Sequence, residues 1–279
     1  TYRGTPHYLA RGTNNHLESH DHRFTDRAYP GRTGITMSMT ELSPVRVQEV
    51  APQIYQVRLP LPFALNHVNC YLLDDGDGWT ILDTGLHWPA AEAGWQAALD
   101  ELHLTPQAIR RIVLTHMHPD HFGMAGYLQQ QTGAPIFVGE VERAAIERVW
   151  VQDSWRDAAA VDFWRGAGLD APLLQTVTEQ VTTLRQRTLP HPANLLTIDV
   201  GQSLDMASRC FQPILAPGHS DGQLIFYSAS DQLLLCGDQV LEKITPNIGL
   251  WPGNASTPLQ TYLASLTELQ SLTVRLALP

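Results

Sequence analysis

The segment from Thr115 to His121 constrains this chain more than any other stretch, because it places three histidines and one aspartate close together. It follows Arg111–Leu114, a short apolar segment that predicts a buried strand, and it precedes a helical pattern that begins at Phe122. In a strand-to-helix turn, side chains with this spacing can converge on one concavity, and the proline within the turn stiffens its backbone. The candidate metal ligands are His116, His118, Asp120 and His121.

Neutral imidazoles with a carboxylate are a ligand set that suits zinc, and less selectively iron or manganese. His116 and His118 would bind one ion from the same side of the extended segment. Asp120 and His121 would reach a second ion about 3.5–4 Å from the first. A polar loop that merely carries several histidines is the alternative interpretation, and the full pattern at a strand end favours the metal site.

At this motif the chain resembles the metallo-β-lactamase superfamily, and further segments match that family in order from about residue 54 to the C-terminus. Ala216–Ser220 would supply His219 to the ion bound by the first two histidines. Leu233–Asp238 would supply Asp238, and the resemblance implies that this aspartate bridges both ions. Thr80–Gly85 matches the family's early strand, where Asp83 would orient a ligating imidazole.

The resemblance implies an α/β fold, a four-layer αβ/βα sandwich with a helical insertion between its halves, here at about residues 140–190. It also implies two divalent metal ions, with zinc expected first and iron or manganese as alternatives. The expected activity is that of a metal-dependent hydrolase of the glyoxalase II-like branch. A metal-bridging hydroxide, oriented by Asp120, would cleave a thioester, a lactone or another activated ester, or a phosphoester.

Three alternatives remain open. The first is a β-lactamase of the same fold. The second is a diiron oxidoreductase, although those relatives carry a glutamate where this chain has His118. The third is a non-catalytic metal-binding relative with a defective second metal position. Glyoxalase II itself is not indicated, because the sequence does not identify basic residues that would hold the carboxylates of glutathione.

The last ligand of the superfamily is a histidine that follows the final strand. Here residues 273–279 predict that strand, and the sequence ends with it. We expect that this sequence stops just before the last ligand. The other possibility is that Asp120, His121 and Asp238 hold the second ion together with water.

Charge and cysteine content indicate which partners and which cellular compartment to expect. The 18 basic and 28 acidic residues give a net charge of −10 without a basic tract, which argues against nucleic acid or an anionic membrane as the principal partner. A small-molecule substrate is therefore expected, and the oligomeric state stays open. Cys70, Cys210 and Cys236 each lie in apolar, strand-like segments, which predicts reduced core residues in a cytoplasmic protein. Cys236 also lies close enough to Asp238 in the sequence to line the site.

Residues 1–40 show no apolar period, which predicts a leader that is either an added tag or a disordered extension. Residues 41–279 are expected to form the enzyme domain. Within it, the loop around residues 63–67 is expected to overhang the metal site, aromatic side chains of the helical insertion could form an apolar wall, and residues 240–251 could border the substrate channel. The pocket candidates are Phe63, His67, Trp150, Trp155, Phe163 and Trp164.

Overall fold

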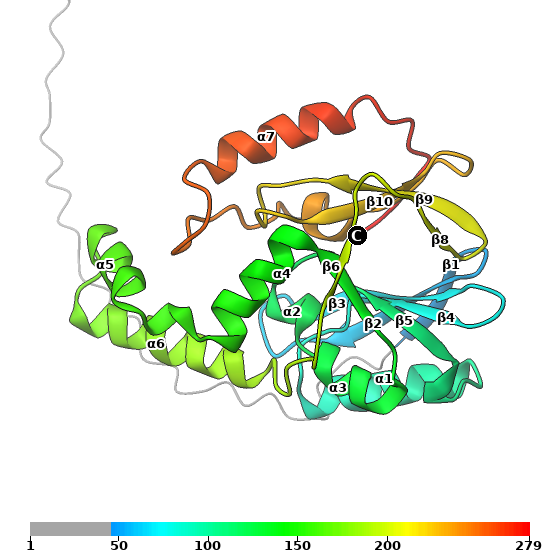
Figure 1. The fold of residues 1–279 in the computed structure, drawn as a ribbon, viewed down its shortest axis with the longest axis horizontal. Coiled ribbons are helices and arrows are strands. Elements are labelled where there is room, and N and C mark those ends of the chain that lie inside the picture. The colour runs from blue at the N-terminus through cyan, green and yellow to red at the C-terminus, as the bar shows by residue number, and fades with distance from the viewer. Residues whose placement is uncertain (1–45) are drawn as a thin grey trace, which may run out of the picture. The chain divides into compact units, whose positions relative to one another are not determined.

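The computed structural model describes residues 46–279, so the expected leader over residues 1–40 lies outside the described residues. The described chain forms two β-sheets with helices against them (Figure 1). This is the α/β arrangement expected from the sequence.

The first sheet has seven strands in sequential order, antiparallel from β1 to β4 and parallel from β4 to β7. The parallel part places the ends of β4 and β5 side by side, which is where the candidate ligands begin. Its strands are β1 (Arg46–Ala51), β2 (Ile54–Pro60), β3 (His67–Asp74), β4 (Trp79–Leu82), β5 (Ile109–Val113), β6 (Ile136–Gly139) and β7 (Leu196–Ile198).

The second sheet has five strands in the order β12-β11-β10-β9-β8. Only the pair β11 and β12 is parallel, because a helix connects these two strands. The strands are β8 (Leu204–Met206), β9 (Arg209–Leu215), β10 (Leu224–Ser228), β11 (Leu233–Leu235) and β12 (Leu276–Leu278).

Helices connect the strands and pack on the sheets. Among the described residues, no helix has both the length and the apolar character needed to cross a membrane. The α-helices are α1 (Pro89–Glu101), α2 (Pro119–Phe122), α3 (Ala125–Thr132), α4 (Glu140–Ile146), α5 (Ala158–Gly166), α6 (Ala171–Gln186) and α7 (Pro258–Leu269). Shorter turns are η2 (Pro106–Ala108), the π-helical η3 (Glu147–Val151), η4 (Ser154–Arg156) and η5 (Gly237–Gln239).

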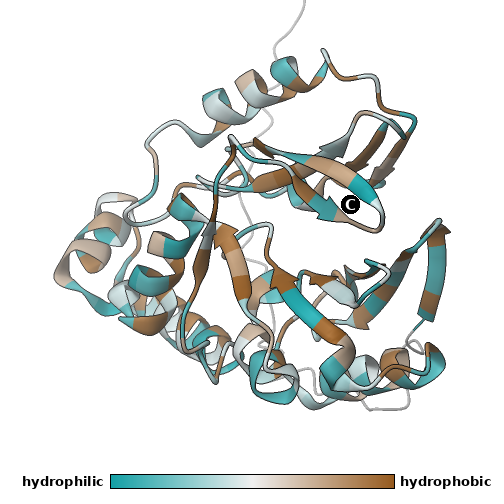
Figure 2. Ribbon diagram, turned by 45° about the vertical axis from the view of Figure 1, so that its right-hand side comes forward, coloured by the Kyte–Doolittle hydropathy of each residue, from teal (hydrophilic) through white to brown (hydrophobic). Residues whose placement is uncertain are grey.

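The alternation of side chains along the strands creates the layers. Successive residues of a strand point to opposite faces, so a strand that is buried on both faces serves two cores. In β3, Tyr71 and Leu73 join the cluster that both sheets share, whereas Cys70 and Leu72 pack in the cluster that includes residues of α1 and α3. In β10, Phe226 faces the shared cluster while Ile225 joins a small cluster beside α7. Figure 2 shows the hydrophobic segments concentrated on the strands. The result is the helix-sheet-sheet-helix order of the expected sandwich.

The structure corrects two details of the sequence analysis. The helical insertion, which we expected between the two halves, interrupts the first sheet, because the segment that follows it forms β7 and pairs with β6. A short edge strand carries no local signal for which sheet it joins. Cys210 is exposed and is not a core residue, because it lies on the opposite face of β9 from the buried Phe211.

The shared core offers a direct test of this packing. Phe226 is fully buried between the sheets, so Phe226→Ala should lower the free energy of unfolding by about 3–5 kcal/mol through lost contacts and a residual cavity. Leu259→Ala on α7 is the control, since Leu259 is 58% exposed and its loss should change stability by less than about 0.5 kcal/mol. Denaturant unfolding of both variants measures the difference, and equal effects would contradict the assigned layers.

Candidate metal centre

The histidine turn lies directly after β5. Thr115 to His118 leave the strand, and Pro119 begins α2 as its first residue, where a missing backbone N–H costs nothing. Backbone N–H groups of His121 and Phe122 both donate to the carbonyl of His118, at 3.0 and 2.8 Å. The turn is therefore fixed by local backbone bonds, and it presents its side chains at the carboxyl end of the parallel strands.

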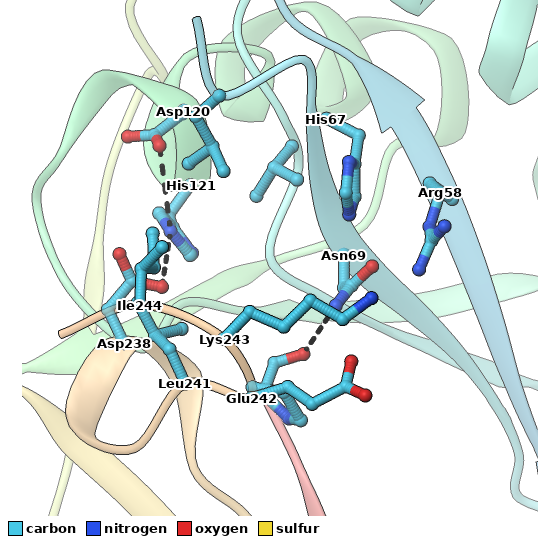
Figure 3. A pocket seen from close by; sticks show the side chains of 13 residues that line it. Arg58, His67, Asn69, Asp120, His121, Asp238, Leu241, Glu242, Lys243 and Ile244 are labelled. Carbon is cyan, nitrogen blue, oxygen red and sulfur yellow. Dashed lines mark hydrogen bonds and ion pairs between the residues drawn. The ribbon is translucent and has the colours of Figure 1, made fainter. Parts of the chain in front are cut away.

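Two cavities meet at this end of the sheets, and Asp120 and Asp238 line both of them. The larger, of about 550 Å³, also exposes His118 and His219, and much of its wall is apolar. The smaller, of about 310 Å³, exposes His121 and is drawn in Figure 3. The candidate ligands thus lie at a junction that a small molecule can reach from two sides.

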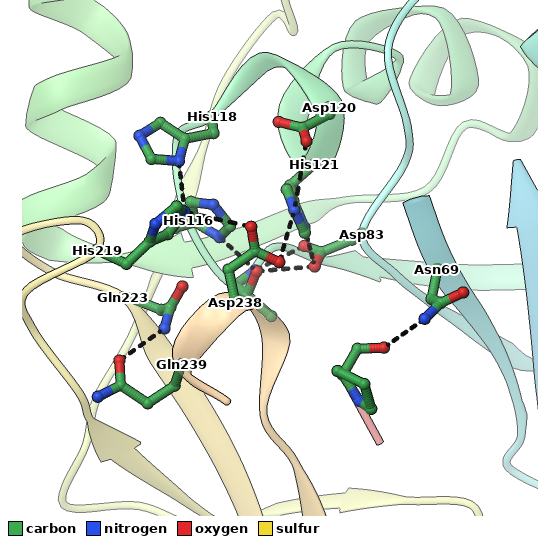
Figure 4. A network of polar contacts seen from close by, with 12 residues as sticks. Asn69, Asp83, His116, His118, Asp120, His121, His219, Gln223, Asp238 and Gln239 are labelled. Carbon is green, nitrogen blue, oxygen red and sulfur yellow. Dashed lines mark hydrogen bonds and ion pairs between the residues drawn. The ribbon is translucent and has the colours of Figure 1, made fainter. Parts of the chain in front are cut away.

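Four imidazoles and one carboxylate converge at the junction (Figure 4). Their donor atoms form two groups, each with all atoms within 4.8 Å of one another. The first group is His116, His118 and His219, and the second is His116, His121 and Asp238. The structure therefore brings together side chains from the turn after β5, the loop after β9 and the turn after β11.

A buried carboxylate fixes the orientation of this cluster. Asp83 accepts hydrogen bonds from the backbone N–H and the hydroxyl of Thr115, at 2.8 and 2.7 Å, and from Nδ1 of His121 at 2.8 Å. Because the Thr115 hydroxyl gives its proton to Asp83, it must accept from Nδ1 of His116, which lies 2.8 Å away. Both imidazoles therefore carry a proton on Nδ1 and present Nε2 to the junction.

The remaining contacts leave ring nitrogens that can bind a cation. Nε2 of His116 and Nε2 of His121 are buried and have no hydrogen-bond partner among the described residues. Nδ1 of His219 donates to the carbonyl of Asn247 at 2.9 Å, so its Nε2 presents a lone pair to Nδ1 of His118 at 2.8 Å. Converging lone pairs of buried imidazoles match the donor set of a divalent transition metal. The residues present therefore fit the metal that the sequence analysis expected.

Asp238 lies between the two groups. One of its carboxylate oxygens is 3.3 Å from Nε2 of His121 and the other is 3.3 Å from Nε2 of His219. Asp120 is farther out than we expected: it belongs to neither group, and its carboxylate comes within 3.9 Å of Nε2 of His121. Asp120 projects from the first turn of α2 toward the wall common to both cavities.

The electrostatics of the cluster favour neutral imidazoles at His116 and His118 and a protonated imidazole at His121. Burial, followed by neighbouring imidazoles, keeps the pKa of His116 and of His118 well below the usual histidine value, so both are neutral near pH 7. Burial also lowers the pKa of His121, but Asp238, Asp83 and Asp120 outweigh it and raise that pKa well above the usual value. Burial would raise the pKa of Asp238, yet the charge on His121 and the close approach of the His121 and His219 rings keep that pKa well below its ordinary range.

Glu142 of α4 is a buried residue of the centre that the sequence analysis missed. Its carboxylate accepts from the backbone N–H of Met117 at 2.7 Å, and from the Ser220 hydroxyl and the Gly222 N–H at 2.6 Å each. It therefore ties the loop of His116 and His118 to the loop of His219. In the sequence Glu142 looks like a solvent-facing residue of an amphipathic helix, and no local signal marks it.

The predicted pocket residues divide into two sets. Trp150, Trp155 and Trp164 line the larger cavity, and His67 lines the smaller one. Phe63 and Phe163 line neither: Phe63 is 43% exposed, and Phe163 packs edge-on against Trp164 with ring centroids 5.1 Å apart.

Two further positions refine this picture. Cys236 is buried with its thiol toward the carbonyl of Val240 and lines neither cavity, and burial raises its pKa to about 12, so it offers no thiolate ligand. Trp251 lines the larger cavity and packs against both Trp155 and Trp164. The sequence analysis expected its loop at the channel but did not single out this side chain.

Fold and centre together define a class, the metal-dependent hydrolases built on two packed sheets. A family model described as "Metallo-beta-lactamase superfamily" matches residues 64–279 of this chain. The chain therefore belongs to the metallo-beta-lactamase superfamily. Its membership supports a general activity as a metal-dependent hydrolase, and members of the superfamily typically bind divalent metals.

Known relatives agree with this assignment. The chain is 35% identical to a metallo-beta-lactamase family protein, TTHA1429, from Thermus thermophilus, over 82% of this chain and 73% of that one with a TM-score of 0.72. A beta-lactamase domain protein from Burkholderia ambifaria is 27% identical over 84% of this chain and 70% of its own, with a TM-score of 0.68. The probable metallo-hydrolase YqjP of Bacillus subtilis (strain 168) is 24% identical over 81% of this chain and 70% of its own.

The role of Glu142 can be tested with a matched pair on one helix. Glu142→Gln puts an amide N–H₂ against a donor of the ligand loops, so it should cost about 1–3 kcal/mol of stability. Because both ligand loops lose a fixed partner, affinity for zinc should fall by about 10- to 100-fold. Glu140→Gln, which removes only an exposed pair with Arg143, is the control. Chelator competition and denaturant unfolding report both effects, and zinc affinity that is equal in the two variants would contradict the role.

The raised pKa of His121 leads to a pH prediction. Without metal, His121 keeps a proton at neutral pH, and the stability from that proton is fully present below the unfolded-state pKa of about 6.5 and is lost as pH rises through the raised folded value. A metal ion at Nε2 must displace this proton, so zinc binding at pH 7 should release about one proton from His121, and affinity should fall on acidification. Titration calorimetry in buffers of different ionisation enthalpy counts the protons, and no release would show that His121 is not a ligand.

Proposed function

We propose that this protein hydrolyses an activated ester or thioester with the help of two divalent metal ions, and that these ions are zinc. The observation that carries the proposal is the convergence of four imidazoles and Asp238 at the junction of two cavities. Two of the ring nitrogens there are buried and have no hydrogen-bond partner among the described residues. An apolar cavity beside such a centre suits a substrate with a hydrophobic group next to its reacting carbonyl.

Each ion has a set of residues that would hold it. His116, His118 and His219 would hold one, and His121 with Asp238 and Asp120 would hold the other, with one Asp238 oxygen toward each group. When bound, the ions would supply a water of lowered pKa and positive charge opposite the oxyanion that develops on the substrate.

The chain's own residues orient the attacking water and limit the access of other water to the site. Asp120 lies on the wall shared by both cavities, where its carboxylate can accept a hydrogen bond from the attacking water. Burial raises its pKa, despite the opposing effect of His121, which makes it a stronger base than an exposed aspartate. Trp150, Trp155 and Trp164 cover the larger cavity with apolar surface and limit water around the carbonyl.

Metal analysis combined with a substrate panel tests the proposal. We expect about two ions per chain when the protein is loaded with zinc, with turnover of thioesters, lactones or aryl esters and weaker turnover of a chromogenic β-lactam. His118→Ala should leave about one ion per chain, whereas His116→Ala should weaken both sites because His116 belongs to both groups. Either change should lower kcat/KM by more than about a thousandfold.

The control variant is His103→Asn, which changes an exposed histidine outside both cavities and keeps a residue that tolerates the positive φ of 55° found there. It should retain wild-type metal content and activity. A zinc-loaded wild-type protein that hydrolyses no ester or thioester, or full activity in His118→Ala, would refute the proposal.

A further inference from the structure

Three buried polar side chains of the second half of the fold form a network beside the metal centre. Gln223, just before β10, donates through Nε2 to Oε1 of Gln239 in η5 at 3.1 Å, and Nε2 of Gln239 donates to the hydroxyl of Ser265 in α7 at 2.7 Å. None of the three residues is more than 4% exposed. Figure 4 shows the two amides next to the candidate ligands, on the side away from Asp120. This amide network therefore connects β10, η5 and α7 directly behind the site.

The hydrogen atoms of the amide network have one consistent assignment. The Ser265 hydroxyl lies 3.1 Å from the carbonyl of Pro217 and 2.9 Å from that of Tyr262, and a carbonyl can only accept. Ser265 must therefore donate to one of these carbonyls and accept from Gln239, which turns Oε1 of Gln239 toward the amide N–H₂ of Gln223. Because both amide orientations are fixed, Gln239 cannot turn over without breaking a hydrogen bond.

The helix of this network also contacts the loop that carries His219. Gly218, the preceding residue, has a φ of +134°, and a Cβ there would lie 2.4–2.8 Å from the N, Cα and Cβ atoms of Tyr262. Such a close approach of loop and helix backbones requires glycine. The Tyr262 hydroxyl in turn donates to the carbonyl of Gln239 at 3.0 Å. Helix α7 thus holds the residue before His219 and the residue after Asp238.

The two ligands at this end differ in how else they are fixed. Nδ1 of His219 donates to the carbonyl of Asn247 at 2.9 Å, so this ring has a partner outside the amide network. Among residues 46–279, the carboxylate of Asp238 pairs only with Nε2 of His121 and of His219, which are themselves candidate ligands. The position of Asp238 therefore depends on its backbone, which the hydrogen bonds of the neighbouring Gln239 hold in place.

We propose that the three residues of the amide network are positioning residues of the metal centre, which fix Asp238 where one carboxylate oxygen faces each group of ligands. The inference rests on the two-ion centre of the proposed function and is independent of the substrate. Loosening the network weakens the ion held by His121 and Asp238 more than the ion held by three histidines, because only the first group contains the displaced carboxylate.

Ser265→Ala tests the network at a residue that bonds to no candidate ligand. It removes the acceptor of the Gln239 amide and leaves every ligand side chain in place. In zinc titrations against chelators of graded affinity, we expect one of two binding steps to weaken by about tenfold and the other to stay within about threefold. The step that weakens should be the one that Asp238→Asn weakens most.

Ser271→Ala is the matched control on the same side of the fold. It removes an exposed hydroxyl that bonds only to the carbonyl of Glu268, just beyond the network's helix. Both zinc-binding steps should stay within about twofold of the wild-type values, as expected for a surface change.

Gln239→Met gives a larger change and a spectroscopic readout. Methionine keeps an unbranched side chain of similar length but makes neither hydrogen bond, so the same zinc-binding step should weaken by about 10- to 100-fold. Cobalt(II) in place of zinc has a visible spectrum that depends on the ligands around the ion. This spectrum should change for one of the two ions in Gln239→Met and in Ser265→Ala.

Phe226→Ala separates positioning from stability. It weakens the core between the sheets without removing a hydrogen bond of the amide network. It should therefore lower the free energy of unfolding and leave unchanged both the ratio of the two zinc affinities and the cobalt spectrum.

The outcomes separate this inference from the proposed function. Two zinc-binding steps with the same affinity ratio in wild type, Ser265→Ala and Gln239→Met would overturn the positioning role and leave the two-ion hydrolase standing. An equal loss in both steps with an unchanged cobalt spectrum would likewise overturn it, since the network would then serve stability alone. A wild-type protein that binds one zinc ion would overturn the two-ion centre and this inference with it.

Discussion

The buried carboxylate of Asp83 is the interaction on which the centre and the first sheet both depend. It follows β4 directly, and it accepts hydrogen bonds from Thr115, just beyond β5, and from His121 in α2. Asp83 takes a left-handed φ of 58°, a conformation that aspartate tolerates better than most residues, and the three hydrogen bonds outweigh that modest cost. The same carboxylate therefore holds the ends of the parallel strands β4 and β5 together and fixes the orientation of two candidate ligands, His116 and His121.

Glu142 performs the corresponding task between the two halves of the fold. Its three hydrogen bonds connect the turn after β5, in the first sheet, with the loop after β9, in the second. Buried carboxylates are costly unless they are fully hydrogen-bonded, and both Asp83 and Glu142 meet that condition without using a basic side chain of lysine or arginine. The positive charge that balances the remaining carboxylates at the junction is left to the His121 proton or to a metal ion.

Sequence alone was sufficient where the signal was local. The turn from Thr115 to His121 and the segments that contain His219 and Asp238 were identified from spacing within a few residues. The structure brings their side chains to one junction, with Asp120 farther out. The rest depends on long-range pairing. In the sequence Glu142 resembles a surface residue, and Phe63 gives no sign that its turn leaves it exposed. No pattern links Arg58 with Lys243, although both line the smaller cavity. Such contacts depend on how the two sheets pack, which periodicity does not encode.

The segment between β11 and α7 shows how this fold separates metal binding from substrate choice. It contributes Leu241 and Ile244 to both cavities, Trp251 to the larger one and Lys243 to the smaller one. Within the same segment, the carbonyl of Asn247 fixes the ring of His219. That tie uses a backbone atom, so it is indifferent to the side chain at position 247, whereas the cavity contacts are made by side chains. Substitutions of these cavity-lining side chains can therefore alter either cavity while the geometry of the candidate ligands, held by buried carboxylates and one main-chain oxygen, stays the same.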